Sequence, residues 1–183
     1  MNMNDDIKVI DNFLSDTDFS YVVDYCKNAS YFYGESDDYG NIPTGENIGK
    51  YVTGMVHEIL PAINSENKIL TLIHNSCFFQ FSELKQFHLR RMYVNCFAPG
   101  EHPRFHIDTP ENVSQLYTCL YYVNEHWDLD EGGETQFYVD NLIYGIPPIP
   151  NRMIIFDGSL MHRATSFKNY HRFSIALKYC KDE

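Results

Sequence analysis

The 183-residue sequence predicts a mainly β fold with flanking helices, built around a sandwich or jelly-roll core. From residue 87 onward, short runs of β-branched and aromatic residues alternate with turn residues, a pattern typical of strands. In segments 89–97, 118–124 and 172–179, one alternating set of side chains is mostly apolar and the other mixes polar with apolar groups. A sheet of such strands can pack helices on one side and line a cavity on the other.

The N-terminal part is expected to supply one strand and several supporting helices. Residues 7–10 form a short apolar strand, and Ser15 and Asp16 can cap a helix that runs to about Cys26. Three further segments are expected to be a surface loop (30–46), a second helix ended by proline (49–60) and a stretch in which helix is favoured (64–86).

Composition and charge limit the kind of protein. No repeat or linker interrupts the chain, so we expect one domain over 1–183, with residues 1–86 supporting a β core over 87–180. A hydrophobic content of 44% and an aromatic content of 15% argue for a packed core rather than disorder. The net charge of −11 disfavours nucleic acid as a partner, and no apolar run approaches the length of a membrane span.

The cysteines indicate the compartment. Five are present without a Cys-x-x-Cys pair, which predicts reduced, buried thiols in the cytoplasm. The N-terminus is acidic and lacks the basic-then-apolar order of a signal peptide. We therefore expect a cytoplasmic protein.

Two histidines and one aspartate form the candidate metal site. His106 and Asp108 are two residues apart after a predicted strand and a Pro-Gly turn, and His162 follows a second strand and turn. Two imidazoles and one carboxylate can hold one face of a metal and leave positions open, as in non-haem Fe(II) oxygenases. The His106-x-Asp108 pair alone, or His162 alone, is more often a surface or structural feature. The prediction of a metal site therefore rests on their occurring together.

The strand that begins at Arg172 offers a site for a dicarboxylate cosubstrate. Arg172 and Ser174 share the face opposite Phe173 and Ile175, where the planar guanidinium could bind a carboxylate through two bonds. Ser174 and Tyr122 could add hydroxyl donors.

Residues 87–179 resemble the catalytic domain of the Fe(II)- and 2-oxoglutarate-dependent dioxygenases, most closely the prolyl 4-hydroxylase-like branch. Five blocks match in order and spacing: His106-Ile-Asp108, 118–128, Gly132-Gly-Glu-Thr135, 156–162 and Arg172-Phe-Ser174. The resemblance implies a double-stranded β-helix, iron at His106, Asp108 and His162, and 2-oxoglutarate held by Arg172 and Tyr122. It also implies O2 as a cosubstrate and ascorbate as a candidate reductant.

The sequence departs from that branch near the metal. Prolyl hydroxylases usually carry a tyrosine shortly before the His-x-Asp pair, and Phe97 stands at the nearest position. Tyr93 and Asn95, on the same strand face, are the candidates to replace it. For Thr135, a cavity-facing role and a turn role are equally open.

The expected function is hydroxylation of an unactivated C–H, with release of succinate and CO2. The resemblance favours a prolyl or other side chain of a protein or peptide. A free amino acid or small metabolite is the alternative, and a non-catalytic cupin-like binding module is a further one, which Asp108 disfavours because cupin sites typically use His-x-His. The acidic segment 30–46 would favour a basic partner, although an ordinary solvated acidic face is the better interpretation. The oligomeric state is not readable from the sequence.

Overall fold

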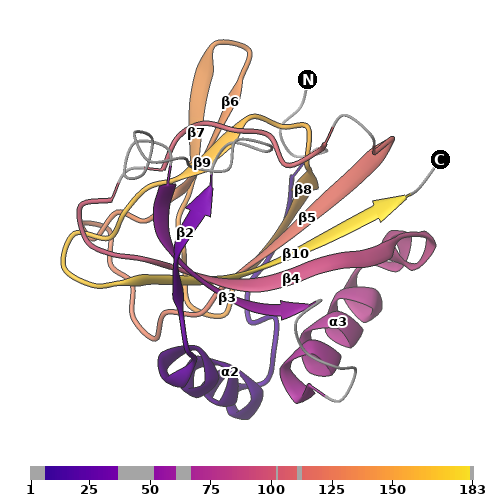
Figure 1. Cartoon of the computed structure of the whole chain (residues 1–183), viewed down its shortest axis with the longest axis horizontal. Coiled ribbons are helices and arrows are strands. Elements are labelled where there is room, and N and C mark those ends of the chain that lie inside the picture. The colour runs from indigo at the N-terminus through magenta and orange to yellow at the C-terminus, as the bar shows by residue number, and fades with distance from the viewer. Residues whose placement is uncertain (1–6, 37–51, 61–66, 102, 111–112, 182–183) are drawn as a thin grey trace.

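In the part of the chain that the structure describes, two antiparallel β-sheets face each other, and two α-helices lie against the outer side of the larger sheet (Figure 1). This is a computed structural model, and it describes residues 7–36, 52–60, 67–101, 103–110 and 113–181. The mainly β fold with flanking helices and its jelly-roll core, a double-stranded β-helix, are thereby confirmed. Within the described ranges, no helix is both long and apolar enough to cross a bilayer.

The larger sheet has seven strands in the described part of the chain, in the order β1-β8-β5-β10-β4-β3-β2. Their bounds are Ile7–Ile10 (β1), Phe32–Ser36 (β2), Val52–Leu60 (β3), His88–Phe97 (β4), Gln115–Tyr122 (β5), Met153–Asp157 (β8) and Arg172–Lys181 (β10). The smaller sheet has the order β7-β6-β9, with bounds Leu142–Ile146 (β7), Thr135–Val139 (β6) and His162–Ala164 (β9).

Both helices begin at capped N-termini. In α2 (Asp16–Asn28), the Ser15 hydroxyl accepts a hydrogen bond of 3.2 Å from the Asp18 amide, as the sequence predicts. In α3 (Lys68–Gln80), the side chain of Asn67 accepts bonds from two amides of the first turn. A short 3-10 helix, Ser82–Gln86, then leads into β4, so the helix favoured within 64–86 is confirmed.

The larger sheet separates two apolar clusters, because successive side chains of a strand point to opposite faces. Met92 of β4 and Leu177 of β10 pack with the helices on the outer face. Tyr93 and Ala176, one residue away along each strand, belong to the cluster between the sheets. The side chains that lie between the sheets are therefore the ones that can line a cavity.

The predicted helix over 49–60 is wrong, because residues 52–60 form strand β3 between β2 and β4. Val52, Val56 and Ile59 have helical spacing but are β-branched, and β-branched side chains suit a pleated sheet. Pairing with β4 decides between the two patterns.

The predicted surface loop over 30–46 is wrong in its first part, since β2 occupies Phe32–Ser36 at the sheet edge. Residues 37–46 lie outside the described ranges. Phe32 and Tyr33 are exposed over 71% and 60% of their surfaces. These two aromatic residues therefore lie on a strand at the sheet edge that is open to solvent.

All five cysteines are buried and none of them forms a disulfide, as expected for reduced thiols. Burial raises the pKa of Cys96 to about 12, with a further contribution from the Glu101 carboxylate. The thiol therefore stays protonated at neutral pH and serves as packing.

Candidate metal and cosubstrate site

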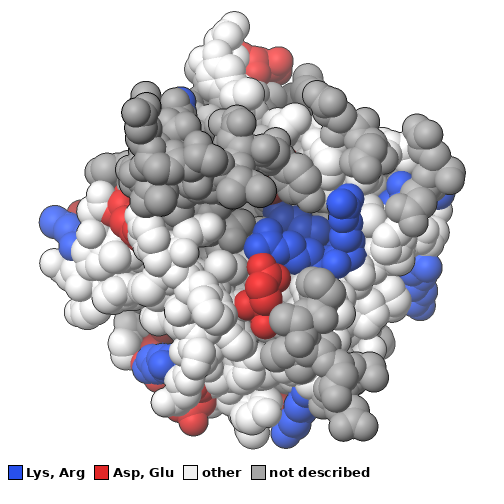
Figure 2. Space-filling view, viewed as in Figure 1, with Lys and Arg blue, Asp and Glu red and all other residues white. Residues whose placement is uncertain are grey.

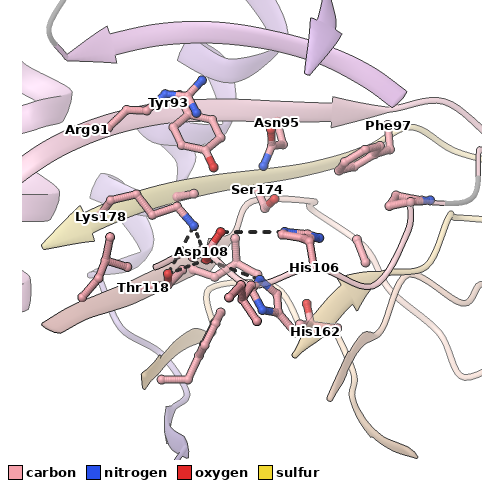
Figure 3. A pocket seen from close by; sticks show the side chains of 18 of the residues that line it. Arg91, Tyr93, Asn95, Phe97, His106, Asp108, Thr118, His162, Ser174 and Lys178 are labelled. Carbon is pink, nitrogen blue, oxygen red and sulfur yellow. Dashed lines mark hydrogen bonds and ion pairs between the residues drawn. The ribbon is translucent and has the colours of Figure 1, made fainter. Parts of the chain in front are cut away.

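A cavity of about 330 Å³ lies between the two sheets. Its walls contain the three candidate metal ligands and four of the other predicted site residues: His106, Asp108, His162, Arg172, Ser174, Tyr93 and Asn95. Figure 3 shows all of these side chains except that of Arg172, and those shown project toward one another from β4, β10 and the segments around the triad. His106 and Arg172, which are 66 positions apart in sequence, thus line the same cavity.

The triad has the geometry of a metal site. One potential ligand atom from each of His106, Asp108 and His162 lies within 4.8 Å of the others. The Nε2 atoms of the two histidines are 3.7 Å and 3.4 Å from the Asp108 carboxylate oxygens. The three candidate ligand atoms are therefore close enough together for one ion to contact all of them.

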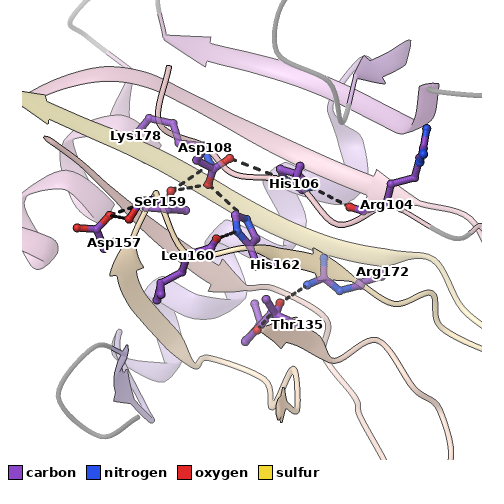
Figure 4. A network of polar contacts seen from close by, with 12 residues as sticks. Arg104, His106, Asp108, Thr135, Asp157, Ser159, Leu160, His162, Arg172 and Lys178 are labelled. Atoms are coloured by element: carbon purple, nitrogen blue, oxygen red, sulfur yellow. Dashed lines mark hydrogen bonds and ion pairs between the residues drawn. The ribbon is translucent and has the colours of Figure 1, made fainter. Parts of the chain in front are cut away.

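Backbone hydrogen bonds fix the three ligand-bearing segments to one another. The amides and carbonyls of His106 and His162 exchange two bonds of 2.9 Å, forming an isolated β-bridge. The Asp108 amide donates to the Gly158 carbonyl at 2.7 Å. In the turn before His162, the Asp157 carboxylate accepts from the amide and hydroxyl of Ser159 (Figure 4).

The two imidazole rings are oriented for coordination through Nε2. His106 Nδ1 lies 2.9 Å from the Arg104 carbonyl, and His162 Nδ1 lies 2.8 Å from the Leu160 carbonyl. A carbonyl can only accept, so each Nδ1 carries the proton and each Nε2 has a lone pair for a metal. This donor set fits the iron that the sequence indicates.

The Asp108 carboxylate is buried and held by two donors. The Thr118 hydroxyl donates to Oδ2 at 2.6 Å, and the Lys178 ammonium contacts the same oxygen. Burial alone would raise the pKa of Asp108, but Lys178 and then His162 and His106 hold it well below its usual range. The carboxylate is therefore ionised and ready to bind a cation.

Arg172 lies buried at one end of the cavity, with 1% of its surface exposed. Its guanidinium donates to the Gly133 carbonyl at 2.8 Å and to the hydroxyls of Ser174 and Thr135 at 3.1 Å each. None of the described residues forms an ion pair with it. Burial lowers the pKa of Arg172, while Tyr122 and Glu134 act in the opposite direction; a buried cation with neutral partners suits an anionic ligand.

Thr135 connects the predicted cosubstrate residues. Thr135 lines the cavity, so of the cavity-facing role and the turn role left open by the sequence, the structure has the first. Its hydroxyl accepts a 2.8 Å hydrogen bond from the Tyr122 hydroxyl. Tyr122 itself is fully buried behind it. The structure thus brings Arg172, Ser174 and Tyr122 together, with Tyr122 connected to the cavity through Thr135.

Tyr93 and Asn95 line the cavity on β4, on the same face as Phe97. The Arg91 guanidinium lies over the Tyr93 ring, 3.8 Å from its centre. Asn95 Oδ1 is buried without a hydrogen-bond partner in the described part of the chain. Because unsatisfied buried acceptors are rare, this oxygen is a candidate contact for a ligand donor.

Sequence reasoning missed two polar residues of the site. Lys178 and Thr118 hold the Asp108 carboxylate, and both line the cavity. The available signal was strand alternation, because Lys178 lies on the same face of its strand as Arg172 and Ser174.

The arrangement defines a class of protein: a jelly-roll domain with an open site of two histidines and one carboxylate, the ligand set of non-haem Fe(II) oxygenases. Residues 91–179 match the family model of the 2OG-Fe(II) oxygenase superfamily. The matched segment carries all the candidate metal and cosubstrate residues, and the name of the superfamily includes the iron and the 2-oxoglutarate expected from the sequence.

Similar proteins include several prolyl hydroxylases. Prolyl hydroxylase EGLN3 of Mus musculus is 26% identical over 98 residues, which cover 49% of this chain and 41% of that protein. The chain thus aligns with about two fifths of this curated relative. Several solved structures share the fold over 97% of this chain, and two of them are described below.

The first is a Trichoplax adhaerens prolyl hydroxylase in complex with a hypoxia inducible factor oxygen degradation domain peptide fragment. It has a TM-score of 0.74 and 18% identity, and 84% of it is covered. The second, a Pseudomonas putida prolyl-4-hydroxylase, has a TM-score of 0.70 and 14% identity, with 93% covered. At these identities, the likeness establishes the fold.

Proposed function

We propose that the protein is an Fe(II)- and 2-oxoglutarate-dependent hydroxylase. The observation that carries the proposal is the buried Arg172 guanidinium, which has no carboxylate partner among the described residues and lies in the same cavity as the triad. A metal-binding triad alone would suit many functions. A fixed cation at the far end of the cavity suits a cosubstrate that has a second carboxylate.

In this proposal, His106, Asp108 and His162 hold the iron through two Nε2 atoms and one carboxylate oxygen. Arg172, with Ser174 and Thr135, binds the distal carboxylate of 2-oxoglutarate. When bound, the iron and 2-oxoglutarate supply O2 activation with release of succinate and CO2. The chain's own residues bind and orient these groups in the cavity between the two sheets.

The proposed substrate is a prolyl or other side chain of a protein or peptide. Support comes from the similarity to prolyl hydroxylases, one of which is described in complex with a peptide. A free amino acid or small metabolite is the alternative, and the cavity of about 330 Å³ has room for either a side chain or a small molecule. A non-catalytic binding module is disfavoured because the triad and Arg172 are all present.

An anaerobic titration with Fe(II) and 2-oxoglutarate tests the proposal, with the weak visible charge-transfer band as the readout. We expect the band in the wild-type protein and its loss in the His162→Ala variant. The matched control is His126→Ala, since His126 is an exposed histidine outside the cavity lining. Absence of the band in the wild type, or its persistence in His162→Ala, would refute the iron assignment.

Succinate formation tests the reaction itself. The protein is incubated aerobically with Fe(II), 2-oxoglutarate and a peptide library that contains proline, and products are examined for the mass of one added oxygen atom. We expect succinate and hydroxylated peptide in equal amounts. Hydroxylation of free amino acids without any peptide product would select the alternative substrate class.

A further inference from the structure

The cavity extends along the paired strands β4 and β10. Arg172 pairs with Phe97, and six residues further along, Lys178 pairs with Arg91. At about 3.3 Å per residue, the two ends lie roughly 20 Å apart. Asp108 contacts Lys178, and Figure 4 shows the triad between Lys178 on one side and Arg172 on the other. If 2-oxoglutarate occupies the Arg172 end, the substrate approaches the metal from the Lys178 end.

A β-bulge places two arginines at the Lys178 end. Lys178 pairs with Arg91, while Tyr179 pairs with Leu89, so Arg90 is an extra residue on β4. Strict alternation along β4 would put Arg90 on the outer, apolar face with Met92. At a bulge, two residues oppose one, and Arg90 and Arg91 accordingly both line the cavity.

The lining has an excess of positive charge, although the whole chain has a net charge of −11. Its cations are Arg90, Arg91, Arg172 and Lys178, and its one carboxylate among the described residues is Asp108. Ferrous iron and the 2-oxoglutarate dianion cancel each other, so loading the site does not remove this excess. Figure 2 shows Lys and Arg side chains gathered at the centre of one face of the molecule.

Three of these cations have assigned partners, and the fourth does not. Lys178 contacts Asp108, and Arg91 forms a bidentate pair with Glu58 of β3. Arg172 faces the proposed cosubstrate carboxylate. Arg90 is exposed, and none of the described residues forms an ion pair or hydrogen bond with it. An exposed cation that no described residue pairs with, at the end of a cavity that holds the triad, is placed to bind an anion.

We propose that the substrate carries an anionic group, a carboxylate or a phosphate, and that Arg90 binds this group at the Lys178 end of the cavity. The inference rests on the proposed function and specifies its substrate class. The acidic segment 30–46 would favour a basic partner, whereas this inference assigns an anionic one. The reason is that the substrate contacts the residues that line the cavity, and their charge is positive although that of the whole chain is negative. This anionic group belongs either to an acidic residue beside the hydroxylated side chain or to a free acid, and the experiment below distinguishes the two sources.

Binding to the loaded protein tests the inference without relying on turnover. Protein with Fe(II) and 2-oxoglutarate is kept anaerobic, and fluorescence anisotropy measures the binding of four labelled proline peptides. These are identical except for one flanking residue, which is Glu, phosphoserine, Gln or Lys. Free glutamate and free glutamine, as competitors, form a second arm that separates a small acid from a peptide. We expect the anionic probes to bind about tenfold more tightly than the Gln or glutamine probes.

Variants identify the residue responsible. We expect Arg90→Gln to reduce the anion preference about fivefold or more. Lys68→Gln is the matched control, because it removes one positive charge from α3, on the outer side of the sheet, and should leave the preference intact. Equal binding of anionic and neutral probes in both arms, or a preference that survives Arg90→Gln, overturns the inference.

The charge-transfer band of the wild-type protein separates the two proposals. A band without any preference for anionic probes would refute this inference alone. Absence of the band would refute the proposed function instead, whatever the probes do.

Discussion

His106 and His162 are joined by two backbone hydrogen bonds of 2.9 Å, one in each direction. This bridge connects residues 56 positions apart in sequence and holds the two imidazole rings with their centres 4.5 Å apart. The ligand rings are thus positioned by main chain as well as by the bonds to their own Nδ1 atoms. Changes that disturb the backbone near this bridge should therefore alter metal affinity without removing a ligand.

Gly158→Ala is expected to weaken metal binding. The Gly158 carbonyl accepts from the amides of Asp108 and Thr109. A Cβ at Gly158 would lie 2.5 Å from Leu116 Cδ2, 2.9 Å from Thr109 Oγ1 and 3.2 Å from the Leu116 carbonyl oxygen, so either these side chains or the turn that anchors Asp108 must shift. Overpacking of this kind costs about 1–3 kcal/mol, and we expect Fe(II) affinity to fall about tenfold in anaerobic titration.

Gly145→Ala is the control for that experiment. A Cβ at Gly145 would meet its nearest atom, Glu134 Cβ, at 3.6 Å, an ordinary contact distance. Its Fe(II) affinity should match the wild type. If Gly158→Ala also binds Fe(II) as the wild type does, the turn does not position Asp108.

Lys178→Met is expected to destabilise the metal-free protein and to increase its response to metal. Lys178 contacts the buried Asp108 carboxylate, and its removal leaves that charge with the Thr118 hydroxyl as donor. Breaking a buried ion pair costs about 3 kcal/mol, so Tm without metal should fall. A bound divalent cation restores a positive partner, and the gain in Tm on adding Zn(II) should exceed that of the wild type.

The double variant Lys178→Met/Asp108→Asn provides the control. With the carboxylate neutralised, the loss of Lys178 should cost less stability than it does alone, which a double-mutant cycle measures. Additive effects of the two changes would show that the contact contributes little.

The metal and cosubstrate residues could be brought together from sequence because each depends on residue type and strand alternation. Arg172 and Ser174, for example, share a face in any regular strand. Strand β3 could not be recognised, because Val52, Val56 and Ile59 fit a helical period as well as a strand, and only pairing with β4 decides. Arg90 could not be placed because a bulge is a property of two paired strands.

Arg172→Lys is expected to weaken 2-oxoglutarate binding strongly while leaving the triad intact. The guanidinium is fixed by bonds to Gly133, Ser174 and Thr135. A lysine ammonium cannot reproduce this fork or bind a carboxylate through two parallel bonds. Charge-assisted bonds contribute about 1.5–3 kcal/mol each, so 2-oxoglutarate affinity should fall about 10- to 100-fold in titrations at saturating Fe(II).

Arg152→Lys is the matched change outside the cavity. Arg152 pairs with Asp11 and donates to the Pro147 carbonyl, so its replacement should leave 2-oxoglutarate affinity unaltered. Equal losses in the two variants would point to a general effect on folding.

The stability of the protein should decrease as the pH falls through the ordinary pKa of histidine, in part because of His74. Burial lowers the pKa of His74 below 6.5 in the folded protein, where its Nδ1 lies 2.9 Å from the Tyr179 hydroxyl and its ring stacks on that of Tyr179. The unfolded chain takes up the proton more readily below about pH 6.5, so the contribution is present above that pH and is lost as the pH falls. Urea unfolding at about pH 7.5 and about pH 5.5 measures the change. In His74→Gln the decrease between the two pH values should be smaller than in the wild type, and an equal decrease would assign the acid sensitivity to other groups.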